Sequence, residues 1–160
     1  MSGALPEGTP VDRVVAALRA AAVDAQVRRF DQSVPTAAAA AAVLGCEVGA
    51  IANSLVFDAD GAPLLVLASG AHRVDTVRVA ALVGARKVRR ATPQFVLEAT
   101  GQEVGGVAPV GHPAPLRTVV DVDLAAFPRL WAGGGDHWTM FAATYEELLR
   151  VTGGEAAAVA

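Results

Sequence analysis

A polar pair, Asn53 and Ser54, interrupts an otherwise apolar run at residues 50–57. The run reads Ala-Ile-Ala-Asn-Ser-Leu-Val-Phe, and its β-branched and aromatic residues predict a buried strand. Strand alternation puts Asn53 among large apolar side chains and Ser54 on the opposite face. A buried amide without partners costs roughly 1–3 kcal/mol. We therefore expect Asn53 either to bond to a neighbouring loop or to line a cleft and donate its NH2 group to a substrate oxygen.

A second candidate site is the segment 101–112, which holds four glycines and a proline in twelve residues. This composition indicates unusual backbone angles or a close approach of the main chain. The Gly-x-x-x-x-Gly-Lys-Ser/Thr spacing of a phosphate loop is absent, and the segment does not join a strand to a helix as a dinucleotide fingerprint does. One hypothesis is that the N–H groups of Gly105 and Gly106 polarise a substrate carbonyl. A plain hairpin turn is the alternative.

Other residues with catalytic potential are less well placed in the sequence. His72, His112 and His137 are too scattered to suggest a metal-ligand spacing, so no metal is expected. His112, at the end of the glycine-rich segment, is the histidine that we expect to come nearest a substrate. The serines lack the context of a nucleophile elbow, which disfavours a serine-hydrolase triad.

Composition limits the class of protein. A chain of 160 residues that is 53% hydrophobic predicts one domain spanning residues 1–160. The net charge of −3 argues against general binding of DNA or other long nucleic acids. One basic run, residues 86–90, is either a charged edge strand or a phosphate contact. The single cysteine, Cys46, fits packing in a reducing compartment, so a cytoplasmic protein is expected, and neither a signal peptide nor a membrane span is indicated.

Short helices and strands alternate along the chain, which predicts a mixed α/β domain. After a polar leader at residues 1–8, helices are predicted over 10–23, 37–44, 74–83, 94–100 and 144–153, and strands over 26–30, 50–57, 63–68, 86–90, 118–122, 129–132 and 137–141. Thr or Ser before the helices and Gly after them supply the caps, and Asp75 is placed in a first helical turn. Residues 155–160 are expected to form a frayed tail.

Together these residues resemble the YbaK/prolyl-tRNA-synthetase-associated editing family. The resemblance covers about residues 27–149 and rests on the segments 52–57, 74–75, 100–101, 104–112 and 131–135. Its most specific part is the Gly-Gly-Val-x-Pro-x-Gly loop that begins at Gly105.

The resemblance implies a compact, mixed barrel-like sheet with short flanking helices. It implies hydrolysis of the ester in mischarged aminoacyl-tRNA with a small amino acid, such as Cys- or Ala-tRNA(Pro), without metal or organic cofactor. The partner is then the acceptor end of the tRNA, and prolyl-tRNA synthetase if the protein is recruited to it. Carried over by position, the residues that act on the ester are Asn53, Gly105 and Gly106, and those that bind substrate are Ser54, Pro109, Gly111, His112 and Gly135.

The sequence departs from the family pattern at one position. The family strand usually reads Val/Ile-x-Lys-Ser/Thr-Leu, and its lysine helps to hold the terminal adenosine and the ester, whereas this chain has Asn53. An Asn lacks the positive charge but still donates a hydrogen bond. Two functions therefore stay open: a trans-acting editing hydrolase, and a catalytically weakened module that binds aminoacyl-tRNA or a synthetase without turnover. The oligomeric state is not predicted.

Overall fold

The computed structural model describes residues 8–160, so the expected leader lies almost wholly outside the described residues. These residues form the helices α1 (Pro10–Ala20), α2 (Ala37–Leu44), α3 (Thr76–Val83), α4 (Pro93–Thr100) and α5 (Tyr145–Thr152), and the 3-10 helices η1 (Val48–Ala50) and η2 (Val122–Ala126). The strands are β1 (Val27–Arg29), β2 (Ile51–Ala59), β3 (Ala62–Ser69), β4 (Val88–Arg90), β5 (Arg117–Asp121), β6 (Leu130–Gly133), β7 (Thr139–Ala143) and β8 (Glu155–Ala157).

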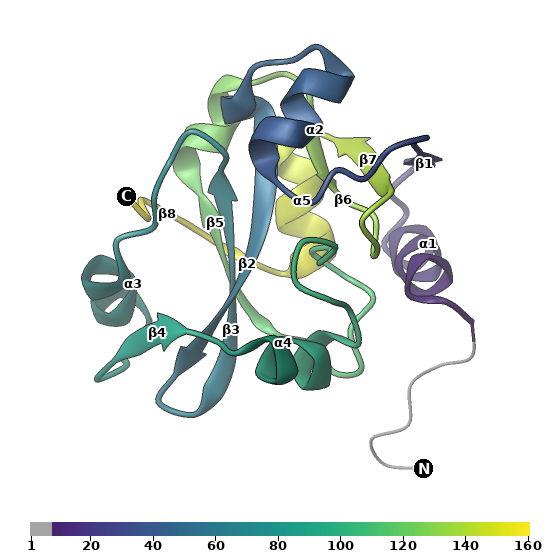
Figure 1. The fold of residues 1–160 in the computed structure, drawn as a ribbon. Coiled ribbons are helices and arrows are strands. Elements are labelled where there is room, and N and C mark those ends of the chain that lie inside the picture. Colours follow the sequence, from purple (N-terminus) through teal and green to yellow (C-terminus); the bar gives the residue numbers. More distant parts are fainter. Residues whose placement is uncertain (1–7) are drawn as a thin grey trace.

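The strands form one mixed sheet in the order β1-β7-β6-β2-β3-β5-β8, and β4 pairs with β2 beside this path. The long hairpin of β2 and β3 runs through the centre of the molecule (Figure 1). β6 joins β2 in parallel, and β5 joins β3 in parallel. This arrangement confirms the mixed α/β class.

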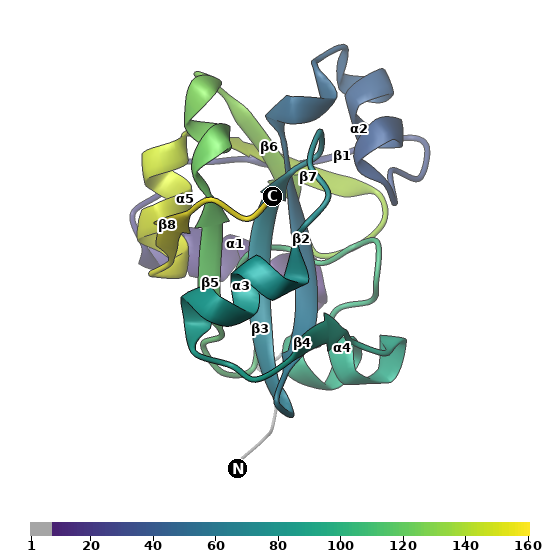
Figure 2. The same cartoon turned by 90° about the vertical axis from the view of Figure 1, so that its left-hand side faces the viewer.

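The two faces of the central hairpin bury different cores. Leu65 and Leu67 of β3 face a core that includes residues of α1, α4 and α5. Leu64 and Val66, which alternate with them, pack against α3 instead. Figure 2 accordingly shows α3 in front of the sheet and α1 behind it. The sheet is therefore buried on both faces, as its continuous apolar sequence indicates.

The predicted capping residues are confirmed, although α1 ends at Ala20 instead of about Val23 and α3 begins at Thr76 instead of Val74. Four threonines accept N-cap hydrogen bonds at the starts of helices: Thr9, Thr36, Thr92 and Thr144. Four glycines in the left-handed conformation end helices: Gly45, Gly84, Gly101 and Gly153. Caps are local, which explains why sequence alone locates them.

Three expectations are corrected. Residues 155–160 are not frayed, because β8 pairs with β5 and the apolar side chain of Val159 is fully buried in the core beneath α3. Asp75 is the N-cap of α3 rather than a first-turn residue, since its carboxylate accepts two main-chain N–H bonds there. β2 continues to Ala59 because β4 pairs with its end, which leaves a two-residue turn. No helix in residues 8–160 is long and apolar enough to cross a membrane.

Candidate functional site

The middle of β2 has a strand partner on one side only. Its first residues, Ile51 and Ala52, pair with β6, and its last three pair with β4, so the edge between them is open. Gly70 N–H donates to the Ile51 carbonyl, which shows that odd-numbered residues of β2 direct their main-chain groups towards β3. By alternation the main chain of Ser54 and Val56 faces the open edge. A gap in the sheet thus leaves main-chain groups of β2 without a strand partner on this side.

A cleft of about 300 Å³ lies at this open edge. Asn53 and Ser54 line it from β2, Gly105 and Val107 line it from the glycine-rich segment, and Gly133 lines it from β6. Further wall residues are Val34, Pro35, Thr36, Ala37, Ala40, Ile51, Ala52, Leu55, Val56, Phe57, Arg90, Ala91, Val96, Val104, Asp136, Thr139 and Met140. The two stretches singled out in the sequence therefore meet in one cavity.

Asn53 and Ser54 reach the cleft from opposite faces of the sheet. Asn53 alternates with Leu55 and Phe57, which pack on the α3 side. Ser54 alternates with Ala52 and Val56, which pack on the side of the glycine-rich segment. Both line the same cavity because it opens at a strand edge rather than over one face.

The Ser54 hydroxyl is the more unusual of the pair. Its oxygen is closed to solvent and has no hydrogen-bond partner among residues 8–160. Buried hydroxyl groups are normally paired, because an unmatched one costs roughly 1–3 kcal/mol. This unpaired hydroxyl belongs to a residue that lines the cleft.

The glycine-rich segment is held by buried hydrogen bonds. Gln102 is 1% exposed, and its side-chain oxygen accepts from Ala108 N–H at 2.7 Å while its NH2 donates to the Val110 carbonyl at 3.2 Å. Gly105 has a φ of +89°, a conformation that favours glycine. Gly106 N–H donates to the Glu103 carbonyl at 2.9 Å, while the Gly105 N–H makes no bond within residues 8–160. Gly105 is thus the better placed of the two to bind an oxyanion.

The other residues predicted to touch substrate lie outside the cleft lining. A Cβ on Gly111 would lie 2.9 Å from the main chain of Val14, and one on Gly135 would lie 3.0 Å from that of Pro10. Both glycines therefore allow α1 to pack closely against them. Pro109 is buried, and a Cβ on Gly106 would meet the Asp136 main chain at 2.8 Å.

His112 bonds to the segment itself. Its Nε2 lies 2.9 Å from the Ala108 carbonyl, which can only accept, so Nε2 carries the hydrogen. Burial lowers the pKa of His112, and the bond to Ala108 opposes this only in part. His112 therefore stabilises the segment as a neutral side chain.

Two ionisable residues line the cleft within the described chain, Asp136 and Arg90. Burial acts to raise the pKa of Asp136, but hydrogen bonds from its neighbours outweigh this and lower it. Those bonds come from Trp138 N–H at 2.9 Å, the Thr139 hydroxyl at 2.8 Å and Arg29 at 3.1 Å. Asp136 is thus engaged in structure and is a poor general base.

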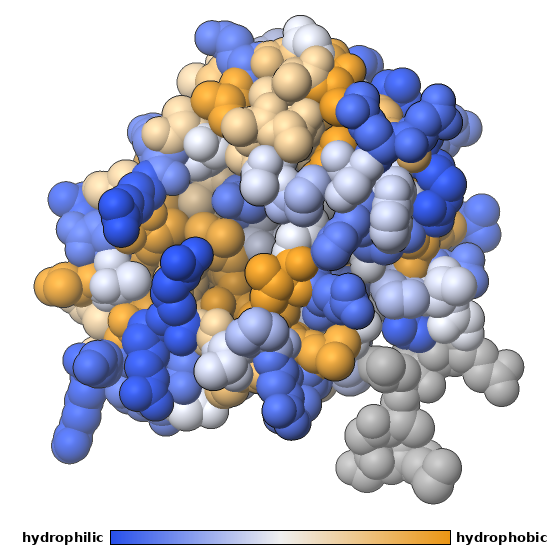
Figure 3. Space-filling view, in the orientation of Figure 1, coloured by the Kyte–Doolittle hydropathy of each residue, from blue (hydrophilic) through white to orange (hydrophobic). Residues whose placement is uncertain are grey.

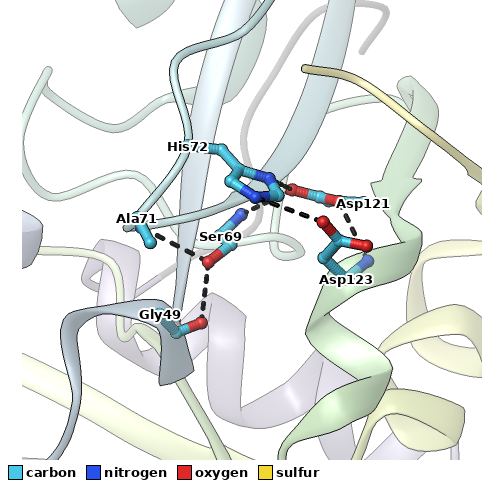
Figure 4. Close-up of polar contacts among 6 residues, drawn as sticks. All are labelled: Gly49, Ser69, Ala71, His72, Asp121 and Asp123. Atoms are coloured by element: carbon cyan, nitrogen blue, oxygen red, sulfur yellow. Dashed lines mark hydrogen bonds and ion pairs between the residues drawn. The ribbon is translucent and has the colours of Figure 1, made fainter.

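A second polar cluster was not anticipated from the sequence. His72 Nδ1 lies 2.8 Å from a carboxylate oxygen of Asp121, and its Nε2 lies 3.2 Å from one of Asp123 (Figure 4). In residues 8–160 these three form the one group with ligand atoms close enough for a metal ion. Asp121, 1% exposed, also accepts from the N–H groups of Ser69 and Asp123, so it ties the end of β3 to η2. The only sequence signal was the Asp-x-Asp spacing; the histidine comes from another loop.

Comparison with known proteins identifies the family to which the chain belongs. Residues 31–151 match the model of the aminoacyl-tRNA editing domain, and the chain belongs to that family. The resemblance to the YbaK-like editing proteins is thereby confirmed. The chain carries an editing domain of the kind that serves translation fidelity.

Individual relatives agree with this assignment. The uncharacterized protein YwhH of Bacillus subtilis is 32% identical over 123 residues, which cover 76% of this chain and 78% of that protein. The proline–tRNA ligase of Bacillus pumilus is 38% identical over 84 residues, which cover 52% of this chain but only 15% of the ligase. A crystal structure described provisionally as a trans-editing enzyme for prolyl tRNA synthetase superposes with a TM-score of 0.88 at 40% identity, covering 96% of this chain and 98% of that one.

Proposed function

We propose that this chain is a trans-acting editing hydrolase that deacylates mischarged aminoacyl-tRNA bearing a small amino acid, such as Cys- or Ala-tRNA(Pro). The observation that carries the proposal is the single cleft lined by Asn53, Ser54 and Gly105 at the open edge of β2. Membership of the editing family and the likeness to proline–tRNA ligases support it.

In this proposal the ester carbon is attacked by water or by the neighbouring hydroxyl of the terminal ribose. With water as the nucleophile, the bond between that carbon and the ribose oxygen breaks, the proton of the water passes to the ribose oxygen, and the products are free amino acid and tRNA. With the ribose hydroxyl as the nucleophile, the acyl group first moves to that oxygen while its proton passes to the oxygen that leaves, and water then hydrolyses the new ester in the same way. Gly105 N–H stabilises the developing oxyanion, and the Asn53 NH2 orients the ester. Ser54 lines the cleft from the opposite face, and its hydroxyl binds the aminoacyl group once the surrounding wall shifts to uncover it.

A second candidate is a module that binds aminoacyl-tRNA or a synthetase without turnover. The specific observation in its favour is the chemistry of the cleft, which has Asn53 in place of the family lysine and whose one carboxylate, Asp136, is engaged in hydrogen bonds. Because no free base lines the cavity within residues 8–160, catalysis would rely on positioning and main-chain polarisation.

The proposal extends to partners and location. It makes the tRNA acceptor end the substrate and prolyl-tRNA synthetase the candidate partner, and it places a single-domain protein in the cytoplasm. None of its steps draws on a metal or organic cofactor.

The test is deacylation of a panel of mischarged tRNAs by the wild type and by Asn53→Ala and Ser54→Ala. Gln94→Ala, which removes an exposed amide of α4 outside the cleft, is the matched control. We expect turnover with small aminoacyl groups, a loss of roughly a hundredfold in Asn53→Ala, and no change in the control. If every tRNA shows saturable binding without turnover, the hydrolase is rejected and the binding module is the function that remains.

A further inference from the structure

β4 brings one cationic side chain to the cleft. Arg90 pairs in register with Phe57 of β2, so the two side chains lie on the same face of the sheet, which is also the face of Asn53. Both Arg90 and Phe57 line the cavity. The position of Arg90 therefore depends on how firmly β4 is attached to β2.

Asp60, in the turn between β2 and β3, makes that attachment. Its carboxylate accepts from Arg86 N–H at 2.8 Å and from Lys87 N–H at 3.0 Å, and its own N–H donates to the Lys87 carbonyl. These bonds lower the pKa of Asp60, so the carboxylate stays charged and able to accept. β4 is thus fixed at its start by the turn and along its length by β2.

Arg90 is the one cation without a counter-ion at this site. Its exposed side chain makes no hydrogen bond or ion pair within residues 8–160. The adjacent Arg89 pairs with Asp58 at 3.5 Å, and the carboxylate of the cleft, Asp136, pairs with Arg29. No carboxylate of the described chain therefore neutralises the positive charge that Arg90 presents.

The spacing suits a nucleotide. Asn53 and Phe57 are four residues apart, so Arg90 stands roughly 13 Å along the strand from Asn53. In an aminoacylated nucleotide the ester and the phosphodiester leave opposite sides of the ribose, so the groups that bind them must also stand apart. On the face that carries β4, hydrophilic side chains border an apolar patch near the centre (Figure 3). Val104, which lines the cleft and is 54% exposed, offers an apolar contact for a base.

We propose that Arg90 forms a phosphate subsite at the mouth of the cleft and binds the phosphodiester next to the aminoacylated nucleotide. The inference rests on the proposed function, because it assumes that the cleft accepts an acceptor end. Arg90 thereby supplies, from β4, the positive charge that Asn53 does not supply from β2, and it acts on binding rather than on the ester.

The experiment measures binding of two probes that carry no amino acid, the dinucleoside phosphate CpA with one negatively charged phosphodiester and neutral adenosine, to the wild type, Arg90→Ala and Arg90→Lys. Arg86→Ala removes an equal charge from the same basic run outside the cleft lining and is the control. We expect CpA to bind the wild type and Arg86→Ala about tenfold more tightly than adenosine, and the preference to vanish in Arg90→Ala and to survive partly in Arg90→Lys. Added salt should weaken the CpA preference in the wild type and in Arg86→Ala, because it screens the attraction between Arg90 and the phosphate, and should have little effect on Arg90→Ala.

A wild type that does not prefer CpA, or an Arg90→Ala variant that keeps the preference, overturns the phosphate subsite. The probes carry no ester, so the result is independent of hydrolysis. A CpA preference lost in Arg90→Ala, together with no deacylation, would refute the hydrolase and retain the subsite. Deacylation without a CpA preference would refute the subsite and retain the hydrolase.

Discussion

The groups proposed to act on the ester are not ionisable. Asn53 and Ser54 offer neutral hydrogen bonds, and Gly105 offers a main-chain N–H. Such groups stabilise charge by fixed orientation, since a preorganised dipole needs no reorganisation during the reaction. Catalytic strength at this site is therefore sensitive to any change in charge at position 53.

Asn53→Lys is expected to raise deacylase activity on the order of tenfold. A charge-assisted hydrogen bond in a partly dry cleft is about twice as strong as a neutral one. The measurement is kcat/KM with alanyl- and cysteinyl-tRNA, with circular dichroism to verify the fold. A folded variant with unchanged or lower turnover would show that the chemistry has been adapted to the amide.

The lowered pKa of His112 should make the stability of the fold depend on pH. Its pKa is lowered by folding from an ordinary value near 6.5, so the unfolded chain binds the proton more readily than the native one. Above that pH neither state carries the proton and the effect is absent; as the pH falls below it, the free energy of unfolding decreases. His112→Gln keeps a donor for the Ala108 carbonyl and cannot titrate. Urea denaturation between about pH 7.5 and pH 5 should show a shallower decline in the variant, and parallel curves would contradict this.

At the scale of elements, the cleft depends on the glycine-rich segment, residues 101–112, being held in one conformation. The glycine-rich segment has no regular structure of its own, and its position comes from Gln102 inside it and from close packing outside it. A Cβ on Gly133 of β6 would lie 2.5 Å from the Val107 carbonyl, so the segment contacts the strand directly.

Gln102→Ala should destabilise the fold by about 1–3 kcal/mol, because it leaves the Ala108 N–H and the Val110 carbonyl buried without partners. Editing activity should fall further than stability explains, since Gly105 follows closely in the same segment. Chemical denaturation and deacylation at a temperature where the variant is folded measure the two effects. Gln94→Ala, an exposed amide, should change neither.

At the scale of the molecule, the cleft is a gap between β6 and β4 walled by small side chains from distant parts of the chain. Ala37 and Ala40 come from α2, Ala52 and Val56 from β2, and Val107 from the glycine-rich segment. Close-packed walls cannot move without displacing the sheet.

The cleft should therefore select aminoacyl groups by size. Alanyl- and cysteinyl-tRNA should be hydrolysed, prolyl-tRNA less well, and phenylalanyl-tRNA rejected by overlap. Discrimination against smaller groups should be weak, at about 1–3 kcal/mol per methylene. Competition among these four tRNAs for binding and hydrolysis is the measurement. Phenylalanyl-tRNA performing as well as alanyl-tRNA would exclude a steric pocket.

The sequence by itself determined most of the elements and the family. Caps such as Thr36 and Gly45, and the apolar run of β2, act through neighbours a few residues away, so their effect is readable locally. Asn53, Ser54 and Gly105 could be singled out because a polar or glycine residue in apolar surroundings needs a structural or functional reason.

Only the tertiary structure decided which residues share the cleft. Gly111 and Gly135 allow α1 to pack closely, and β4 places Arg90 in the lining of the cleft. The burial of Val159 and the meeting of His72 with Asp121 likewise depend on contacts between residues far apart in the chain. Strand pairing has no signature in either strand alone, because the register is set by the sheet and core that the whole chain forms.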